Sequence, residues 1–200
     1  MTKVFSTITT SIDGYYAGPN DGPGKGLGEG GERLHYWVFG GPWSYAVEPK
    51  GEATGADKQF LDDANGRLGA VICGRSTYEA ADHWGGENPW PVPLFVVTHR
   101  PEEEPPGAGF TFVPDFDTAL ERAKAAAGDR DISIMGGGSL IREAFRAGVI
   151  EEFTHSTAPV VLGGGKRLFE DFDESFDLEP IKTYSSPYAT HVTYRVRGRQ

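Results

Sequence analysis

The feature that most constrains the fold is an alternation of short apolar segments with amphipathic ones, which starts at residue 69. Runs of apolar and β-branched residues predict buried strands at 69–74, 93–100, 109–114 and 131–135. The helical spacing of apolar residues predicts helices at 75–85, 115–128 and 139–148. Strands that alternate with helices form parallel sheets with right-handed crossovers, so a parallel α/β core is expected.

The two ends of the chain add strands to this core. Residues 3–14 predict a first strand that ends in an Asp-Gly turn, and residues 151–165 and 189–197 predict the last strands. No helical pattern separates these last strands, so they are expected to form an antiparallel edge. Shorter helices are expected at 32–40 and 55–66. A length of 200 residues favours a single domain, 1–200.

Composition excludes several classes of function. The chain has 19 Lys and Arg residues against 29 Asp and Glu residues, and a net charge of −10 argues against a nucleic-acid partner. Cys73 is the only cysteine, so neither a disulfide framework nor a multi-thiolate metal site is expected, and the histidines lack metal-ligand spacing. No signal peptide or membrane-spanning segment is evident, which predicts a cytoplasmic protein without a membrane partner. The oligomeric state stays open, with a homodimer as one expectation.

Three consecutive glycines, Gly136, Gly137 and Gly138, stand where a predicted strand gives way to a helix. The amides of Ser139 and Leu140 would then lie at the helix start, where free N–H groups and the helix dipole attract anions. A tight turn with close helix–sheet packing is the alternative explanation. We expect a phosphate site, because three glycines exceed what such a turn requires.

A second strand-to-helix junction, formed by Gly74, Arg75, Ser76 and Thr77, has the same design. Arg75 offers a planar fork for a phosphate, and Ser76 or Thr77 could equally be an ordinary helix cap. Two such junctions suggest one ligand with more than one phosphate. The G-x-G-x-x-G pattern fails, because Ile141 occupies the place of its last glycine, and no P-loop is present.

The chain resembles the dihydrofolate reductase superfamily along nearly its full length. The motifs that carry the resemblance are SIDG at 11–14, VICGRSTYE at 71–79, IMGGGSLI at 134–141 and APVVLGGGKRLF at 158–169. The most similar branch contains the reductase domain of the bifunctional riboflavin-biosynthesis deaminase-reductase. This resemblance implies a three-layer α/β fold: a mixed, mostly parallel sheet with helices on both faces and an antiparallel C-terminal edge.

The resemblance also implies NADPH as the cofactor and assigns its binding residues. The 2′-phosphate and adenosine side fall to Arg75, Ser76, Thr98, His99 and Arg100. The pyrophosphate falls to Thr77 and to the glycine run at 136–138, with a cis peptide bond between Gly136 and Gly137. The glycines would then allow the backbone to approach the cofactor.

The substrate side rests on fewer signals. Asp13 ends the first strand where the nicotinamide should lie and is the catalytic candidate, although an Asp-Gly turn explains it equally well. Glu32, His35 and Trp37 could line the substrate pocket or belong to a helix with one buried aromatic face. Lys166 and Arg167 could hold a substrate phosphate or belong to a solvated hairpin loop.

The glycine-rich stretch 17–31 lacks periodicity and is expected to be a mobile loop over the site, acting as a lid. Its glycines leave little to hold it in place without a ligand.

The expected function is NADPH-dependent reduction of a small heterocyclic substrate, similar to the reduction of 5-amino-6-(5-phosphoribosylamino)uracil in riboflavin biosynthesis. A dihydrofolate or pterin reductase is the enzymatic alternative. Dihydrofolate reductases carry a Pro-Trp pair followed by a carboxylate on the first helix; Pro42, Trp43 and Glu48 have that spacing, which we treat as coincidence. A non-catalytic NADPH sensor is the alternative from another class. No deaminase domain is expected, because its zinc signature needs P-C-x-x-C and Cys73 stands alone.

Overall fold

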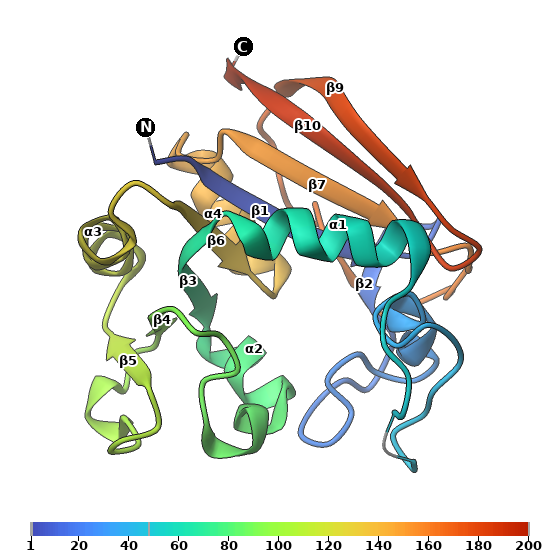
Figure 1. Cartoon of the computed structure of the whole chain (residues 1–200), viewed down its shortest axis with the longest axis horizontal. Helices are drawn as coiled ribbons and strands as arrows, with labels where there is room; N and C mark the ends of the chain where they lie inside the picture. The colour runs from blue at the N-terminus through green and yellow to red at the C-terminus, as the bar shows by residue number, and fades with distance from the viewer. Residues whose placement is uncertain (1, 48, 200) are drawn as a thin grey trace.

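A computed structural model describes residues 2–47 and 49–199, which form a central eight-stranded sheet (Figure 1). Its strands are β1 (Val4–Thr10), β3 (Leu68–Gly74), β4 (Leu94–Val97), β5 (Phe110–Val113), β6 (Asp131–Met135), β7 (Glu152–Thr157), β9 (Phe176–Ser185) and β10 (Thr190–Arg199). The strand order is β5-β4-β3-β6-β1-β7-β10-β9. A separate two-stranded ribbon pairs β2 (Tyr15–Ala17) with β8 (Lys166–Arg167).

The pairing directions confirm the predicted mixed sheet. Strands β5, β4, β3, β6, β1 and β7 pair in this order and are parallel to one another. Strand β10 runs antiparallel to β7, and β9 runs antiparallel to β10, so the C-terminal strands form the antiparallel edge. The sequence patterns did not reveal β9, because Pro180 interrupts its apolar–polar alternation and most side chains of this edge strand are exposed.

The helices cover both faces of the sheet, as the predicted three layers require. They are α1 (Gly55–Gly66), α2 (Arg75–Ala80), α3 (Phe116–Ala127) and α4 (Gly138–Arg146), with short 3-10 turns η1 (Gly31–His35), η2 (Asp82–Gly86) and η3 (Pro101–Glu103). Apolar residues of α3 and α4 pack with Ile72 and Ile132 in one core cluster. On the other face, Tyr78 of α2 packs with Phe5 and Val71. Helix α1 crosses this second face in Figure 1.

Two predicted helices are shorter than expected. The segment 75–85 leaves the α-helical conformation after Ala80, because Asp82, His83 and Trp84 adopt left-handed backbone angles. The Trp84 ring lies against Tyr78, Phe110 and Trp90, and this packing accompanies the break. The predicted helix at 32–40 is reduced to the turn η1.

Strand order decides which loops become neighbours. Because β3, β6 and β1 are adjacent and parallel, their carboxyl ends meet at one edge of the sheet. Helix α2 follows β3, the glycine run follows β6, and Asp13 follows β1 at this edge. In Figure 1 the arrow of β3 points towards the lower edge of the molecule, where α2 lies. The candidate site is therefore built there.

Candidate functional site

The two glycine-containing junctions touch each other. The backbone N–H of Gly137 donates a hydrogen bond of 2.8 Å to the hydroxyl oxygen of Thr77, which lies 60 residues away in the sequence. This bond joins the start of α2 to the turn before α4. The sequence analysis treated the junctions as parts of one site, and the structure brings them together.

The glycine run has a different geometric cause from the one expected. All peptide bonds among the described residues are trans, so the predicted cis bond between Gly136 and Gly137 is wrong. Gly136 instead has a φ of 103°, a conformation that other residues rarely adopt. A Cβ atom on Gly136 would lie 2.2 Å from Thr77 Oγ1. The close approach of the Thr77 side chain therefore requires the glycine.

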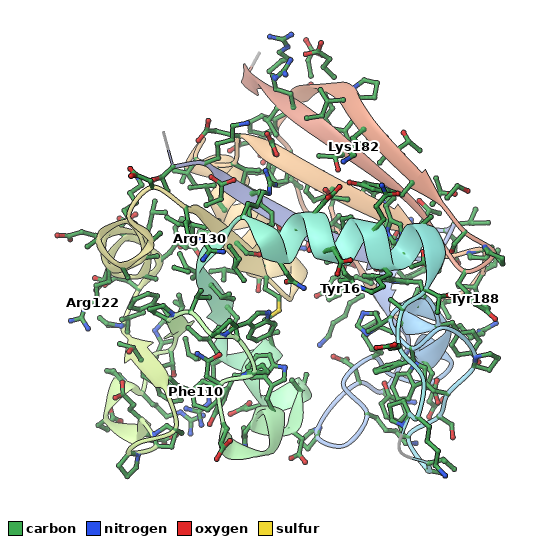
Figure 2. All side chains as sticks on the ribbon, viewed as in Figure 1. Tyr16, Phe110, Arg122, Arg130, Lys182 and Tyr188 are labelled. Carbon is green, nitrogen blue, oxygen red and sulfur yellow. The ribbon has the colours of Figure 1, made fainter. Side chains whose placement is uncertain are left out.

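The amino end of α4 is crowded by a residue that the sequence analysis missed. A Cβ atom on Gly138, the first residue of α4, would lie 2.8 Å from Cε1 of Tyr16. Tyr16 belongs to β2, and Figure 2 places its label just below α1. No motif marks Tyr16, because only the folding of the β2–β8 ribbon over the sheet edge brings its ring to the glycine run.

Ser139 and Leu140, whose backbone amides were predicted to attract an anion, lie in the first turn of α4. Leu140 is buried in the core, whereas Ser139 is exposed. The amides in the first turn of α4 have no partner within the helix, and the helix dipole points its positive end in the same direction. Helix α4 has nine residues, enough to present these groups to an anion at the sheet edge.

Arg75 and Arg100 converge, but each is already paired with carboxylates. Arg75 donates from Nε to Glu79 at 2.7 Å and from Nη2 to Glu103 at 2.9 Å. Arg100 donates to the other oxygen of Glu103 at 3.0 Å and lies 3.5 Å from Glu79. The guanidinium of Arg75 also stands 5.3 Å above the ring of Phe112. The Arg75 side chain is thus fixed in place by two acidic partners that the sequence patterns did not reveal.

The remaining residues of the predicted adenosine side flank this cluster. Gly74 ends β3 with ordinary extended angles, and Ser76 is exposed at the start of α2. Thr98 is buried, and its hydroxyl accepts a 3.1 Å hydrogen bond from the backbone N–H of Arg100. His99 between them is exposed. Thr98 therefore shapes the turn that presents His99 and Arg100.

Asp13 fastens one loop to the end of β1. Its carboxylate accepts hydrogen bonds from the backbone N–H groups of Leu162 (3.0 Å) and Gly163 (2.7 Å). Hydrogen bonds from the Ser11 side chain and from these amides lower the pKa of Asp13 to about 2. The Asp13 carboxylate therefore holds the 162–163 segment against the end of β1 and is ionised at neutral pH.

The three candidates near η1 separate into different environments. Trp37 is buried against Phe60 and donates from its indole nitrogen to Thr9 at 3.1 Å, which is the environment of a core residue. His35 is half-buried with its ring edge-on to Trp37, and burial lowers its pKa to about 4. The imidazole of His35 is therefore neutral at physiological pH. Glu32 is half-buried on the same turn.

Lys166 and Arg167 both face the β2 side of the molecule. Lys166 forms a 2.5 Å ion pair with Asp21, and Arg167 donates to the Tyr15 hydroxyl at 3.1 Å while its guanidinium lies over the Tyr15 ring. The carbonyl of Leu168, next in the chain, accepts a 2.7 Å hydrogen bond from Arg142 of α4. These contacts hold the segment beside the start of α4.

The glycine-rich loop 17–31 is better anchored than expected. Backbone hydrogen bonds link Gly18 to Leu27 and Glu29 to Pro19, which closes the loop on itself. At Gly26 the loop packs so closely on α2 that a Cβ atom would lie 2.2 Å from the Ala80 carbonyl oxygen. The expectation that little holds this loop is wrong, because backbone groups rather than apolar side chains fix it.

A chain of hydrogen-bonded, buried polar side chains was also missed by the sequence patterns. Asp57, in the first turn of α1, accepts from Nε2 of His191 at 3.0 Å, and Nδ1 of His191 lies 2.6 Å from the hydroxyl of Ser156. All three side chains are buried. The only sequence signal was an acidic residue in a helical first turn, which normally marks a solvated helix end. Glu48, the carboxylate of the Pro42-Trp43 spacing, lies outside the described residues.

Two hollows of about 300 and 260 Å³ open elsewhere on the molecule, and none of the predicted site residues lines either of them. The described part of the chain contains no group of three or more His, Cys, Asp or Glu side chains that could hold a metal ion. Within the same residues, every helix is too short or too polar to cross a bilayer.

Comparison with known proteins identifies the family. Residues 2–190 match the model of the RibD C-terminal domain. The chain belongs to the RibD C-terminal domain family. This membership confirms the resemblance inferred from the four sequence motifs. A 70-residue stretch is also 43% identical to the uncharacterized protein YyaP of Bacillus subtilis, and it spans 34% of this chain and 37% of that protein.

Solved structures confirm the fold of this RibD C-terminal domain. A candidate riboflavin biosynthesis protein from Shewanella sp. PV-4 superimposes with a TM-score of 0.71 at 23% identity, over 98% of this chain and 100% of that one. Dihydrofolate reductase from Enterococcus faecalis, complexed with NADP(H) and RAB-propyl, gives a TM-score of 0.60 at 15% identity, over 98% and 97% of the two chains. At these identities the likeness establishes the dihydrofolate-reductase-like fold.

Proposed function

We propose that this protein is an NADPH-dependent reductase of a small heterocyclic substrate related to riboflavin biosynthesis. The observation that carries the proposal is the hydrogen bond between Gly137 and Thr77. It joins two strand-to-helix junctions at the carboxyl ends of adjacent parallel strands, which is where α/β sheets bind phosphorylated ligands. Membership of the RibD C-terminal domain family supports reductase chemistry at this edge.

The cofactor would lie across the ends of β6, β3 and β4. Its pyrophosphate would contact Thr77, the glycines at 136–138 and the first-turn amides of α4, at Ser139 and Leu140. Arg75 and Arg100 would face the 2′-phosphate, with Ser76, Thr98 and His99 beside the adenosine. Bound NADPH supplies the hydride. The protein contributes orientation and exclusion of water.

The substrate would lie beyond the carboxyl end of β1. Asp13 holds the loop that carries Leu162 and Gly163, and the same loop leads to Lys166 and Arg167. These two cations would contact a substrate phosphate, which supports a ribosylaminouracil phosphate as the substrate. Glu32 and His35, the latter with a neutral imidazole, would contact the substrate from the turn η1. We assign Asp13 to holding this loop rather than to proton transfer.

The structure gives less support to a pterin substrate. In the first turn of the first α-helix, the carboxylate of Asp57 is buried and accepts a hydrogen bond from His191. The observed arrangement uses this carboxylate inside the protein. The ribosylaminouracil phosphate therefore remains the preferred class.

The proposal is tested by following NADPH oxidation with a panel of ribosylaminouracil phosphates, dihydrofolate and dihydropterins. We expect turnover with the phosphorylated uracil derivative. We expect a lower rate in Thr77→Val, because this variant lacks the hydroxyl that accepts the hydrogen bond from Gly137. NADPH binding without turnover on any member of the panel would indicate a sensor instead. Absence of NADPH binding would overturn the proposal. Cytoplasmic location and homodimer formation stay predictions.

A further inference from the structure

Arg75 and Arg100, proposed to face the 2′-phosphate of the cofactor, are both ion-paired with carboxylates of the protein. Arg75, Glu79, Glu103 and Arg100 form a closed ring of four charges, with N–O distances of 2.7, 2.9, 3.0 and 3.5 Å around it. Glu103 bridges the two arginines, because one of its oxygens accepts from each. The two positive charges are therefore balanced by two negative charges at the same place.

The arrangement of the Arg75 fork is specific. Its Nε and Nη2 groups, which form one hydrogen-bonding edge, are taken by Glu79 and Glu103. Its Nη1 group is buried and has no hydrogen-bond partner among the described residues. The Arg75 side chain is 22% exposed, whereas those of Glu79 and Glu103 are 41% and 39% exposed. The cation is thus fixed, and the carboxylates are the parts of the ring that can move into solvent.

A 2′-phosphate monoester carries about two negative charges, so it must meet positive charge to bind well. A neutral ring offers none until a carboxylate leaves. A ribose 2′-hydroxyl is different, because it can donate a hydrogen bond to a carboxylate, as NAD-binding acidic residues accept it in other α/β folds. The same ring therefore penalises NADPH relative to NADH as long as Glu103 stays in place.

We propose that Glu103 is a specificity-determining residue that competes with the cofactor's 2′-phosphate for Arg75 and Arg100. This inference rests on the proposed function, which places the adenosine side of the cofactor at this ring. Glu103 lies in the short turn η3, not on a long helix, so its side chain can rotate away without disturbing the sheet. NADPH binding requires that rotation, and NADH binding does not.

The experiment measures the affinities of adenosine 2′,5′-bisphosphate and adenosine 5′-monophosphate (AMP) by titration calorimetry, because this pair differs only in the 2′-phosphate. Glu103→Gln keeps the shape of the side chain and removes its charge. We expect about a tenfold gain in affinity for the bisphosphate, as for the loss of two exposed competing ion pairs, and no change for AMP. Arg75→Ala should weaken binding of the bisphosphate alone.

Glu102→Gln is the matched control, because Glu102 is an exposed neighbour on the same turn that forms no ion pair within the described residues. An equal gain in Glu102→Gln, or an equal gain for both ligands in Glu103→Gln, would reveal a general charge effect and overturn the inference. If the protein oxidises NADPH but Glu103→Gln leaves the preference for the nucleotide with a 2′-phosphate unchanged, the inference is overturned and the proposed function stands. If wild-type protein and variant bind neither nucleotide nor NADPH, the proposed function falls with it.

Discussion

His191 and Asp57 are joined inside the protein, with Nε2 of the imidazole 3.0 Å from Oδ1 of the carboxylate. A carboxylate only accepts, so Nε2 carries the proton, and Nδ1 accepts from the hydroxyl of Ser156. The imidazole also stacks on Phe60, with ring centroids 4.3 Å apart. The pair ties α1, which carries Asp57, to β10 and β7 at the centre of the antiparallel edge.

Asp57→Ala should lower the free energy of unfolding by about 1.5–3 kcal/mol, because it leaves a buried imidazole N–H without its charged acceptor. Urea denaturation followed by tryptophan fluorescence measures the loss. Asp62→Ala on the same helix is the control: its ion pair with Lys58 is exposed, and a change within about 0.5 kcal/mol is expected. Equal losses in the two variants would show that the buried pair contributes nothing specific.

Stability should decrease as the pH falls below about 6.5, the ordinary histidine pKa. Burial lowers the pKa values of His35, His155 and His191 in the folded protein. The unfolded chain therefore binds protons more readily than the folded one, and acid favours unfolding. For His35 the loss should continue down to its folded pKa of about 4.

Urea midpoints measured between pH 8 and pH 4 test this pH dependence. His35→Gln removes one of the three groups, so its midpoint should vary less with pH than that of the wild-type protein. A stability that is constant from pH 8 to pH 5 would contradict the assignment of neutral buried histidines. Asp13 acts in a different window, because its lowered pKa contributes stability that is lost only as the pH falls from about 3.8 towards 2.

Replacement by alanine should have different effects at the adjacent glycines Gly136 and Gly137. Gly136→Ala is expected to cost about 1–3 kcal/mol or more of stability, since φ is 103° and the new Cβ would collide with Thr77. Gly137 has a φ of −59°, and its Cβ would meet Thr77 Oγ1 at an ordinary 3.5 Å. Gly137→Ala should therefore remain folded while losing NADPH affinity. Thermal denaturation and fluorescence titration separate the two effects, and unchanged NADPH affinity would remove Gly137 from the cofactor site.

The loop 17–31 should show two classes of amide in hydrogen exchange. The amides of Gly18 and Glu29, which are hydrogen-bonded to Leu27 and Pro19, should exchange slowly before any ligand is added. Exposed amides at the loop tip should exchange fast and become protected only with cofactor and substrate together. Asp21→Asn, which breaks the ion pair with Lys166, should speed exchange at the tip without affecting β1. Identical exchange with and without ligands would exclude a lid.

Local patterns were sufficient for the parallel core. Runs such as 69–74 and 131–135 can be buried only inside a sheet covered on both faces, and the apolar residues Leu140, Ile141, Ala144 and Phe145 recur at helical spacing and are buried in α4. The two glycine junctions were also visible, because a strand that ends on glycine before a helix is a feature of neighbouring residues. Strand β9 was not visible, because an exposed edge strand carries no burial pattern.

The chain by itself determined the alternation of strands and helices, the antiparallel end and the junctions at Gly74 and Gly136, since all of these follow from periodicity and glycine over short distances. Only the tertiary structure decided which polar groups meet. Arg75 reaches Glu103 across 28 residues, and His191 reaches Asp57 across 134. Such contacts depend on strand order and on the positions of loops. The free energy that fixes this arrangement comes from the whole packed core rather than from the residues in contact. For the same reason, Gly136 accommodates the Thr77 side chain with a positive φ and a trans peptide bond.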